Sequence, residues 1–238
     1  MATKEAFLAN VRQALAKGGQ SPAIPSPGVN MIQNAVDLRK GLAQKKDALL
    51  AQLQKNAVLQ EWNVVTVASE GEARDAIIAI AKGLDADLVV RTSHPIVERL
   101  GLDEALAATS IESVLLAASS FNGDREQLQD IAARAKVGVT GVDYLIAETA
   151  SASLVSREGM SRMASLLPPV HIAVAHIDQV MENLGDLLTL REAELADEDV
   201  PNWYLNLVSG PSKTADIEQT IVIGVHGPGE VHLVVITG

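Results

Sequence analysis

A short stretch near the C-terminus, SGPSKTADIE from Ser209 to Glu218, has the composition of a loop that cradles an anionic group. It follows the apolar run Leu205–Val208, which predicts a strand, and ligands of open α/β sheets lie outside the carboxyl ends of strands. A helix that starts near Thr214 would direct free N–H groups at the anion, and Lys213 would add a positive charge. An ordinary capped turn with a solvated lysine is the alternative. The predicted ligand-binding residues of this loop are Ser209, Gly210, Ser212, Lys213 and Thr214.

Positive side chains are scarce in the C-terminal part of the chain. From Thr140 onward the only Lys and Arg residues are Arg157, Arg162, Arg191 and Lys213. Because positive side chains are so rare here, we expect each of them to bind a specific partner. We predict that Arg162 and Lys213 bind the same anion. The alternative is that Arg162 pairs with a nearby acid, such as Asp143 or Asp216.

One carboxylate has the setting of a catalytic group. Glu148 follows an apolar run and precedes small residues, in the sequence IAETAS. A carboxylate at the mouth of such a strand can act as a base or nucleophile once burial raises its pKa. Alternatively, it accepts backbone N–H bonds in a turn. We treat Glu148 as the candidate catalytic residue.

Two histidines lie beside the unusual segments. His171 begins a predicted strand after two prolines, and His226 lies in a turn bounded by glycines. Both are predicted to contact the ligand, with a structural, hydrogen-bonded histidine as the alternative, and Asp143 and Asp216 are predicted to orient neighbouring groups. The helical zinc spacings H-x-x-x-H and H-E-x-x-H are absent, so we predict no metal. A convergence of His171, His226 and Asp143 on a metal stays an alternative. His94, His176 and His232 carry no pattern that indicates a function.

Composition narrows the class of protein. The chain has 238 residues, of which 47% are hydrophobic but only 3% aromatic, so its core must be built from Ala, Val, Ile and Leu. The absence of cysteine excludes disulfides, thiol catalysis and Cys-ligated clusters in this chain. The net charge of −11 disfavours nucleic acid as a partner. No apolar run approaches 18 residues and no signal peptide is recognisable, so we expect a cytoplasmic protein without membrane insertion.

Helical and extended patterns alternate along the chain. We expect residues 1–60 to form a helical arm with a linker rich in Pro and Gly at 18–28, and residues 61–238 to form an α/β domain. Ser69 and Glu72 predict a capped helix that ends near Gly83, and Asp124 predicts the cap of a second helix. A third helix is expected to begin after Asp178. The predicted strands are Asn63–Ala68, Asp87–Thr92, Ser113–Ala118, His171–Ile177, Leu205–Val208 and Val231–Ile236. Tyr144–Ala147 is an apolar run, and Ser151–Ser156 is predicted to be an extended segment of small residues.

This alternation predicts a three-layer α/β/α fold with a mainly parallel sheet and helices on both faces. The helical arm would precede this domain, and it would cover either its own core or a neighbouring subunit.

Four segments together resemble the LUD-domain family. They are GVTGVDYLIAET (Gly138–Thr149), SRMASLLPPVHIAV (Ser161–Val174), SGPSKTADIE and GVHGP (Gly224–Pro228), and their order and spacing match. Within the family, the chain is most similar to the lactate-utilisation C type. One departure concerns the glutamate motif: family members commonly have E-T-G-T, whereas this chain has Glu148-Thr149-Ala150-Ser151. The loss of glycine restricts positive φ and close backbone approach there.

The resemblance implies a fold similar to ribose-5-phosphate isomerase, glucosamine-6-phosphate isomerase and the CoA transferases. It also implies membership of a bacterial system that oxidises L-lactate to pyruvate together with iron–sulfur proteins. Iron–sulfur centres are then expected only in those partner proteins, and no cofactor is expected in this chain.

Two functions follow as hypotheses. In the first, the chain is a non-redox subunit of the lactate-oxidation system that binds a small anionic ligand or a partner. In the second, it is a free-standing isomerase- or CoA-transferase-like enzyme that acts on a phosphorylated or CoA-linked substrate. Glu148 would then be the base or nucleophile, with Lys213 and Arg162 holding the anion. Whether the chain is an enzyme stays open.

Overall fold

The structure is a computed structural model that describes residues 29–196, 204–215 and 220–238, with isolated positions between 4 and 13. The predicted linker at 18–28 and the predicted site residue Asp216 lie outside these described residues. Within the described ranges, no helix combines the length and the apolar character that a membrane span requires.

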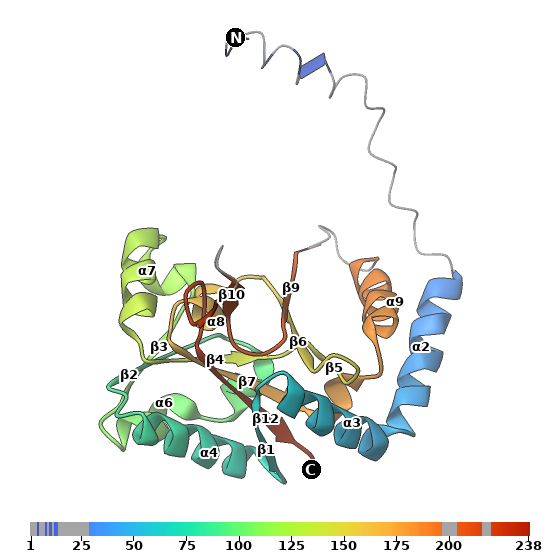
Figure 1. Ribbon diagram of the computed structural model, residues 1–238, viewed down its shortest axis with the longest axis horizontal. Coiled ribbons are helices and arrows are strands. Elements are labelled where there is room, and N and C mark those ends of the chain that lie inside the picture. Colours follow the sequence, from blue (N-terminus) through green and yellow to red (C-terminus); the bar gives the residue numbers. More distant parts are fainter. Residues whose placement is uncertain are drawn as a thin grey trace.

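A six-stranded parallel sheet forms the centre of the molecule (Figure 1). Every pair of neighbouring strands runs in the same direction. The predicted α/β fold with a mainly parallel sheet flanked by helices is therefore confirmed. In spatial order the strands are β1 (Asn63–Val67), β12 (Glu230–Ile236), β7 (Val170–His176), β4 (Val137–Gly141), β2 (Leu88–Arg91) and β3 (Glu112–Leu115).

Alternating side chains of these strands enter two apolar layers, as the period of two in a strand requires. Val89, Val139 and Ile172 face one layer, which three helices cover. Ala173 and Leu233 face the other layer. The helices of the first layer are α4 (Glu70–Gly83), α5 (Pro95–Arg99) and α6 (Leu102–Ala107).

The opposite face of the sheet is covered by a helix and a second, smaller sheet (Figure 1). Leu49, Leu53 and Ala57 of helix α3 (Lys46–Leu59) are buried there, so this part of the predicted arm packs on its own core. The strands of the small sheet are β8 (Val180–Met181), β5 (Tyr144–Ile146), β6 (Ser151–Val155) and β9 (Leu205–Val208).

The remaining helices surround this arrangement. Leu128 and Ala132 of α7 (Arg125–Arg134) and Ala164 of α8 (Met163–Leu166) share a core cluster with β2. Helices α2 (Val29–Ala43) and α9 (Leu184–Leu195) pack together against β5 and β8. Two 3-10 turns complete the elements, η1 (Ala118–Phe121) and η2 (Ile177–Gln179).

Two predicted helix starts have different outcomes. Ser69 caps α4 as predicted, because its hydroxyl accepts a hydrogen bond from the Glu72 N–H at 3.2 Å. The start expected for a helix directly after Asp178 is wrong: Asp178 lies in η2, and α9 begins six residues further on, at Leu184, with Asn183 as its cap. The Asn183 side chain accepts the Asp186 N–H at 3.1 Å.

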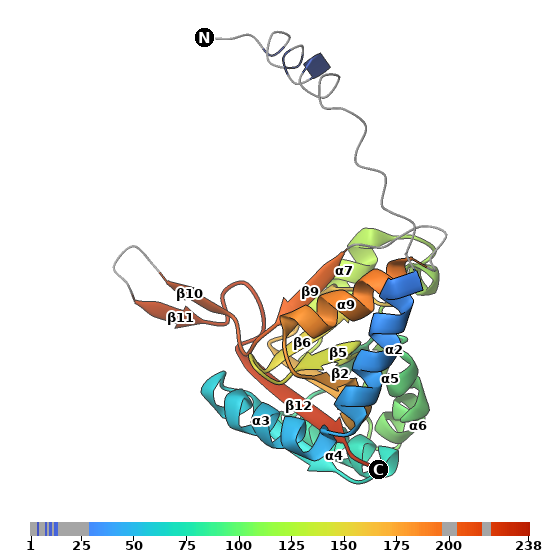
Figure 2. The same cartoon turned by 90° about the vertical axis from the view of Figure 1, so that its right-hand side faces the viewer.

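The predicted anion-binding loop also has a different structure. Residues Lys213–Ala215 form strand β10, which pairs with β11 (Ile221–Ile223), so the predicted helix near Thr214 is wrong. This hairpin projects from the body of the molecule (Figure 2). The preceding strand β9 is antiparallel to β6 in the small sheet, and the loop therefore does not follow a strand of the parallel sheet.

Candidate functional site

The strand order places a crevice between the carboxyl ends of β2 and β4. After β2 the chain enters α5 on one face of the sheet, and after β4 it enters the small sheet on the other face. Because the two neighbouring strands send their connections in opposite directions, the sheet has a topological switch point here, where open α/β sheets bind ligands.

Five of the ten residues that line this crevice carry a hydroxyl group, and most of the others are apolar. Thr92 is 2% exposed, and its Oγ1 has no hydrogen-bond partner in the described part of the chain. The enclosed volume is about 20 Å³, which is room for about one water-sized group. The crevice as it stands thus admits the oxygen of a carboxylate but not a whole metabolite. The polar residues that line it are Thr92, Thr140, Ser156, Ser161, Arg162 and Ser165.

Arg162 supplies the positive charge. Its guanidinium lies over the ring of Tyr204, 4.4 Å from the ring centre, and Nη1 donates to the Tyr204 hydroxyl at 2.5 Å. The Ser165 hydroxyl donates to the Arg162 carbonyl at 3.0 Å, which fixes the backbone of this segment. No acid among the described residues forms an ion pair with Arg162. An anion in the crevice would meet a guanidinium whose orientation an aromatic ring already sets.

Asp143 is held at the adjoining end of β4, but it does not pair with Arg162. Its Oδ2 accepts the Val155 N–H at 2.6 Å, and its Oδ1 accepts from Arg157 at 2.7 Å. Burial alone would raise the pKa of Asp143, but His94, the Val155 N–H and Arg157 outweigh burial and lower that pKa. Asp143 is therefore ionised, and it joins the loop after β4 to the end of β6 and to Arg157 just beyond it.

His94 lies beside this carboxylate, although its sequence context indicated no function. Its Nε2 is 3.8 Å from Asp143 Oδ1, and its Nδ1 accepts the Ile96 N–H at 3.3 Å. Gly141 makes room for it, because a Cβ at this position would overlap the imidazole ring. The position of His94, two residues after the end of a predicted strand and directly before a proline, is the only signal in the sequence that could have placed it here.

His171 contacts the crevice only through Thr140. Its Nε2 lies 2.8 Å from Thr140 Oγ1, while its Nδ1 has no partner among the described residues. The side chain is fully buried, and this burial, with His232 nearby, lowers the pKa of His171 to about 4. His171 is thus a neutral support behind Thr140. The described His, Asp and Glu side chains form no cluster of three that fits a metal ion.

We expect this buried histidine to make stability depend on pH. The folded pKa of about 4 lies below the ordinary 6.5, so the unfolded chain binds the proton first as pH falls. Stability from this group is complete above pH 6.5 and declines by about 1.4 kcal/mol per pH unit down to about pH 4. The free energy of unfolding can be measured with urea at pH 7, 6, 5 and 4.5. As the pH is lowered, this free energy should fall less for His171→Gln than for the wild type. Parallel pH profiles for the two proteins would contradict this assignment.

Comparison with known proteins identifies the family. Residues 50–236 match the sequence profile of the LUD domain. The chain belongs to the LUD domain family. It is 26% identical to a Lactate utilization protein C of Halalkalibacterium halodurans, over 94% of each chain. It is 30% identical to the protein YkgG of Escherichia coli K12, over 93% of each chain.

A solved structure shares the fold. The crystal structure of a DUF162 family protein from Deinococcus radiodurans matches with a TM-score of 0.57 and 21% identity. The match covers 81% of this chain and 98% of the other. The LUD resemblance drawn from the four sequence segments is thereby confirmed, together with the α/β fold.

In this LUD domain, the predicted anion loop lies apart from the crevice walls. Lys213 pairs with Glu61 at 2.8 Å, and the hydroxyls of Ser209 and Ser151 are 2.5 Å apart. Gly210 has φ +95° and packs so closely on the Gln60 carbonyl that a Cβ would overlap it. The ligand-binding role of these residues stays a prediction.

The rest of this segment is held by the turn before β12. The Ser212 N–H donates to the Pro228 carbonyl at 2.8 Å, and the Ser212 carbonyl accepts from Gly224 at 2.9 Å. His226 is exposed in the same region, and Thr214 is partly buried on β10. None of these residues lines the crevice.

Glu148 lies in the turn between β5 and β6, and its side chain is exposed. The burial on which its predicted catalytic role depended is therefore absent. Its backbone is fixed instead, because the Glu148 N–H donates to the Glu182 carbonyl at 3.0 Å and Asn56 donates to the Glu148 carbonyl at 2.9 Å. Catalysis through Glu148 stays a prediction.

The alanine that replaces the expected family glycine adopts a left-handed backbone. Ala150 has φ +49° and is 1% exposed, and its carbonyl accepts a hydrogen bond from the Trp62 indole at 2.9 Å. A left-handed backbone conformation costs a residue other than glycine about 1–2 kcal/mol in the folded state. Replacement by glycine removes this cost, but glycine also gives the unfolded chain more conformational entropy, which offsets part of the gain. We expect Ala150→Gly to stabilise the protein by up to about 1 kcal/mol in urea unfolding. A lower stability would show that the Ala150 methyl group contributes more by packing than its backbone costs.

Proposed function

We propose that this LUD protein acts in lactate utilisation, and that the crevice between β2 and β4 binds a small carboxylate such as a 2-hydroxy or 2-oxo acid. The observation that carries the proposal is the chemistry of the crevice walls. Arg162 stands at the opening without an acidic partner in the described part, and the unsatisfied Thr92 hydroxyl lies inside. The names of several relatives, Lactate utilization protein C, support this substrate class.

The roles of the crevice groups follow from their chemistry. A guanidinium recognises a carboxylate with charge-assisted hydrogen bonds, which are roughly twice as strong as neutral ones. The hydroxyls of Thr92 and Ser161 can donate to the second oxygen or to a 2-hydroxyl group. Since the enclosed part holds only about one water-sized group, the remainder of the ligand would lie towards Arg162 and Tyr204, whose side chains are exposed.

The redox step is assigned to other proteins. The chain has no cysteine, and iron–sulfur clusters are held mainly by cysteine thiolates. We propose that the chain functions in the cytoplasm as a non-redox component beside iron–sulfur partner proteins, to which it presents or from which it receives the carboxylate.

Reconstitution tests this proposal. The purified chain is added to purified iron–sulfur proteins of a bacterial lactate-utilisation system, and L-lactate oxidation is followed with an electron-accepting dye. We expect faster oxidation with the wild-type chain and a loss of that stimulation with Arg162→Gln. A chain that neither associates with these proteins nor changes their rate would refute the proposal.

A further inference from the structure

A second pocket lies where helices α2 and α3 meet. Its volume is about 350 Å³, within the range of roughly 300–1,000 Å³ that is typical of small-molecule sites. The 3-10 turn η2, strands β5 and β8 and helix α9 complete its walls. It shares no lining residue with the crevice between β2 and β4.

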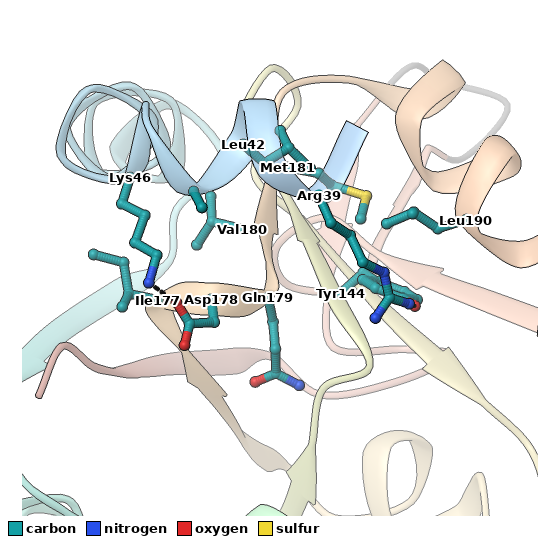
Figure 3. Close-up of a pocket in the computed structure, with 11 residues that line it drawn as sticks. Arg39, Leu42, Lys46, Tyr144, Ile177, Asp178, Gln179, Val180, Met181 and Leu190 are labelled. Atoms are coloured by element: carbon teal, nitrogen blue, oxygen red, sulfur yellow. Dashed lines mark hydrogen bonds and ion pairs between the residues drawn. The ribbon is translucent and has the colours of Figure 1, made fainter. Parts of the chain in front are cut away.

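The pocket has an apolar middle and two polar ends (Figure 3). At one end Lys46 pairs with Asp178, so the charges there are matched. At the other end Arg39 and Tyr144 lie close together. The apolar side chains between and around these ends are Leu42, Ala43, Ile177, Val180, Met181 and Leu190.

The guanidinium group of Arg39 makes only weak contacts with its protein neighbours. Arg39 Nη2 is 3.4 Å from both the Tyr144 hydroxyl and Glu194 Oε1, and its side chain is 60% exposed. Both Glu194 oxygens have nearer donors: the Tyr144 hydroxyl donates to Oε1, and Arg191 donates to Oε2 at 2.6 Å. Arg39 therefore makes only long contacts with these neighbours.

Tyr144 stays a hydrogen-bond donor at this end. Burial raises the pKa of its hydroxyl, and the neighbouring Glu194 raises that pKa further. The hydroxyl keeps its proton and holds Glu194 in place. A ligand carboxylate at this end would thus give Arg39 a closer acceptor than the protein provides.

We propose that this pocket binds an amphipathic organic anion. Its carboxylate pairs with Arg39, and its apolar body lies over Leu42, Val180 and Met181. The matched Lys46–Asp178 pair at the far end offers no net charge, so the carboxylate has one preferred orientation. This site is independent of the proposed lactate-type crevice.

Calorimetric titration of the full chain with octanoate tests the proposal, with octylammonium as a probe of the same chain length and opposite charge. We expect octanoate to bind and octylammonium not to bind. Arg39→Gln should weaken octanoate binding by about tenfold, the effect of losing one charge-assisted hydrogen bond. Ala43→Trp, at an exposed rim position, should block binding without unfolding the chain, as circular dichroism would show.

Arg74→Gln is the matched control, because it removes one arginine charge from α4, outside both the pocket and the crevice, and should leave octanoate binding unchanged. Absence of octanoate binding to the wild type would overturn the proposal. So would equal binding of octylammonium, or octanoate binding that is unaffected by Arg39→Gln and by Ala43→Trp.

Discussion

Replacing Gly138 by alanine is expected to destabilise the protein by at least about 3 kcal/mol, a large fraction of the roughly 5–15 kcal/mol that stabilises a domain. Gly138 is the second residue of β4, which packs against α8. A Cβ at this position would overlap the carbonyl oxygen of Ala164 and lie 3.0 Å from Pro168. The overlap is with backbone, so the strand and the helix must move apart as units.

The separation should also disturb the crevice, because α8 follows Arg162 directly and contains Ser165. Urea unfolding measures the stability loss, with Gly41→Ala as the matched control. Gly41 lies inside α2 with no atom close to the position of a Cβ, and alanine there should stabilise the helix by up to about 1 kcal/mol. If Gly138→Ala has the same urea midpoint of unfolding as the wild type, β4 and α8 do not pack as closely as the structure shows.

Arg162→Gln is expected to reduce the affinity for L-lactate and pyruvate by at least about tenfold. The charge-assisted hydrogen bonds of one guanidinium account for roughly 1.5–3 kcal/mol. Glutamine keeps a long polar side chain and removes only the charge, so the folded structure should persist. Calorimetric titration of each acid into wild-type and variant protein measures the effect.

Lys213→Gln is the corresponding control for the site predicted from sequence. Lys213 lies on the projecting hairpin and pairs with Glu61 at 2.8 Å. Removal of the Lys213 charge should therefore leave the carboxylate affinity within about twofold of the wild type. A larger loss with Lys213→Gln than with Arg162→Gln would place the ligand in the loop Ser209–Thr214 instead of the crevice.

The parallel sheet could be predicted because its strands have strong local signals. The β-branched run at Asn63–Val67 and the cap at Ser69 required no knowledge of the rest of the chain. Strand β4 was missed because it contains Gly138 and Gly141, which disfavour a strand in sequence. Both glycines are needed by close neighbours, Ala164 and His94, that only the folded chain brings near.

The candidate site was only partly predictable for a similar reason. Arg162 stood out because cations are rare in this part of the chain, and it lines the crevice. Thr92 and Ser165 had no distinguishing pattern, since single hydroxyl residues are common. Their convergence depends on the order of strands in the sheet, which local sequence does not determine. The same limit applies to Lys213, whose position on a hairpin follows from pairing with β11.

The central claim is that the crevice between β2 and β4 receives the carboxylate of a small organic acid. The most direct measurement is a crystal structure of the protein grown with saturating L-lactate or pyruvate. We predict a carboxylate within hydrogen-bond distance of the Arg162 guanidinium and the Thr92 hydroxyl. A ligand bound at the Ser209–Thr214 loop, or a crevice that holds only water at saturating ligand, would contradict this account.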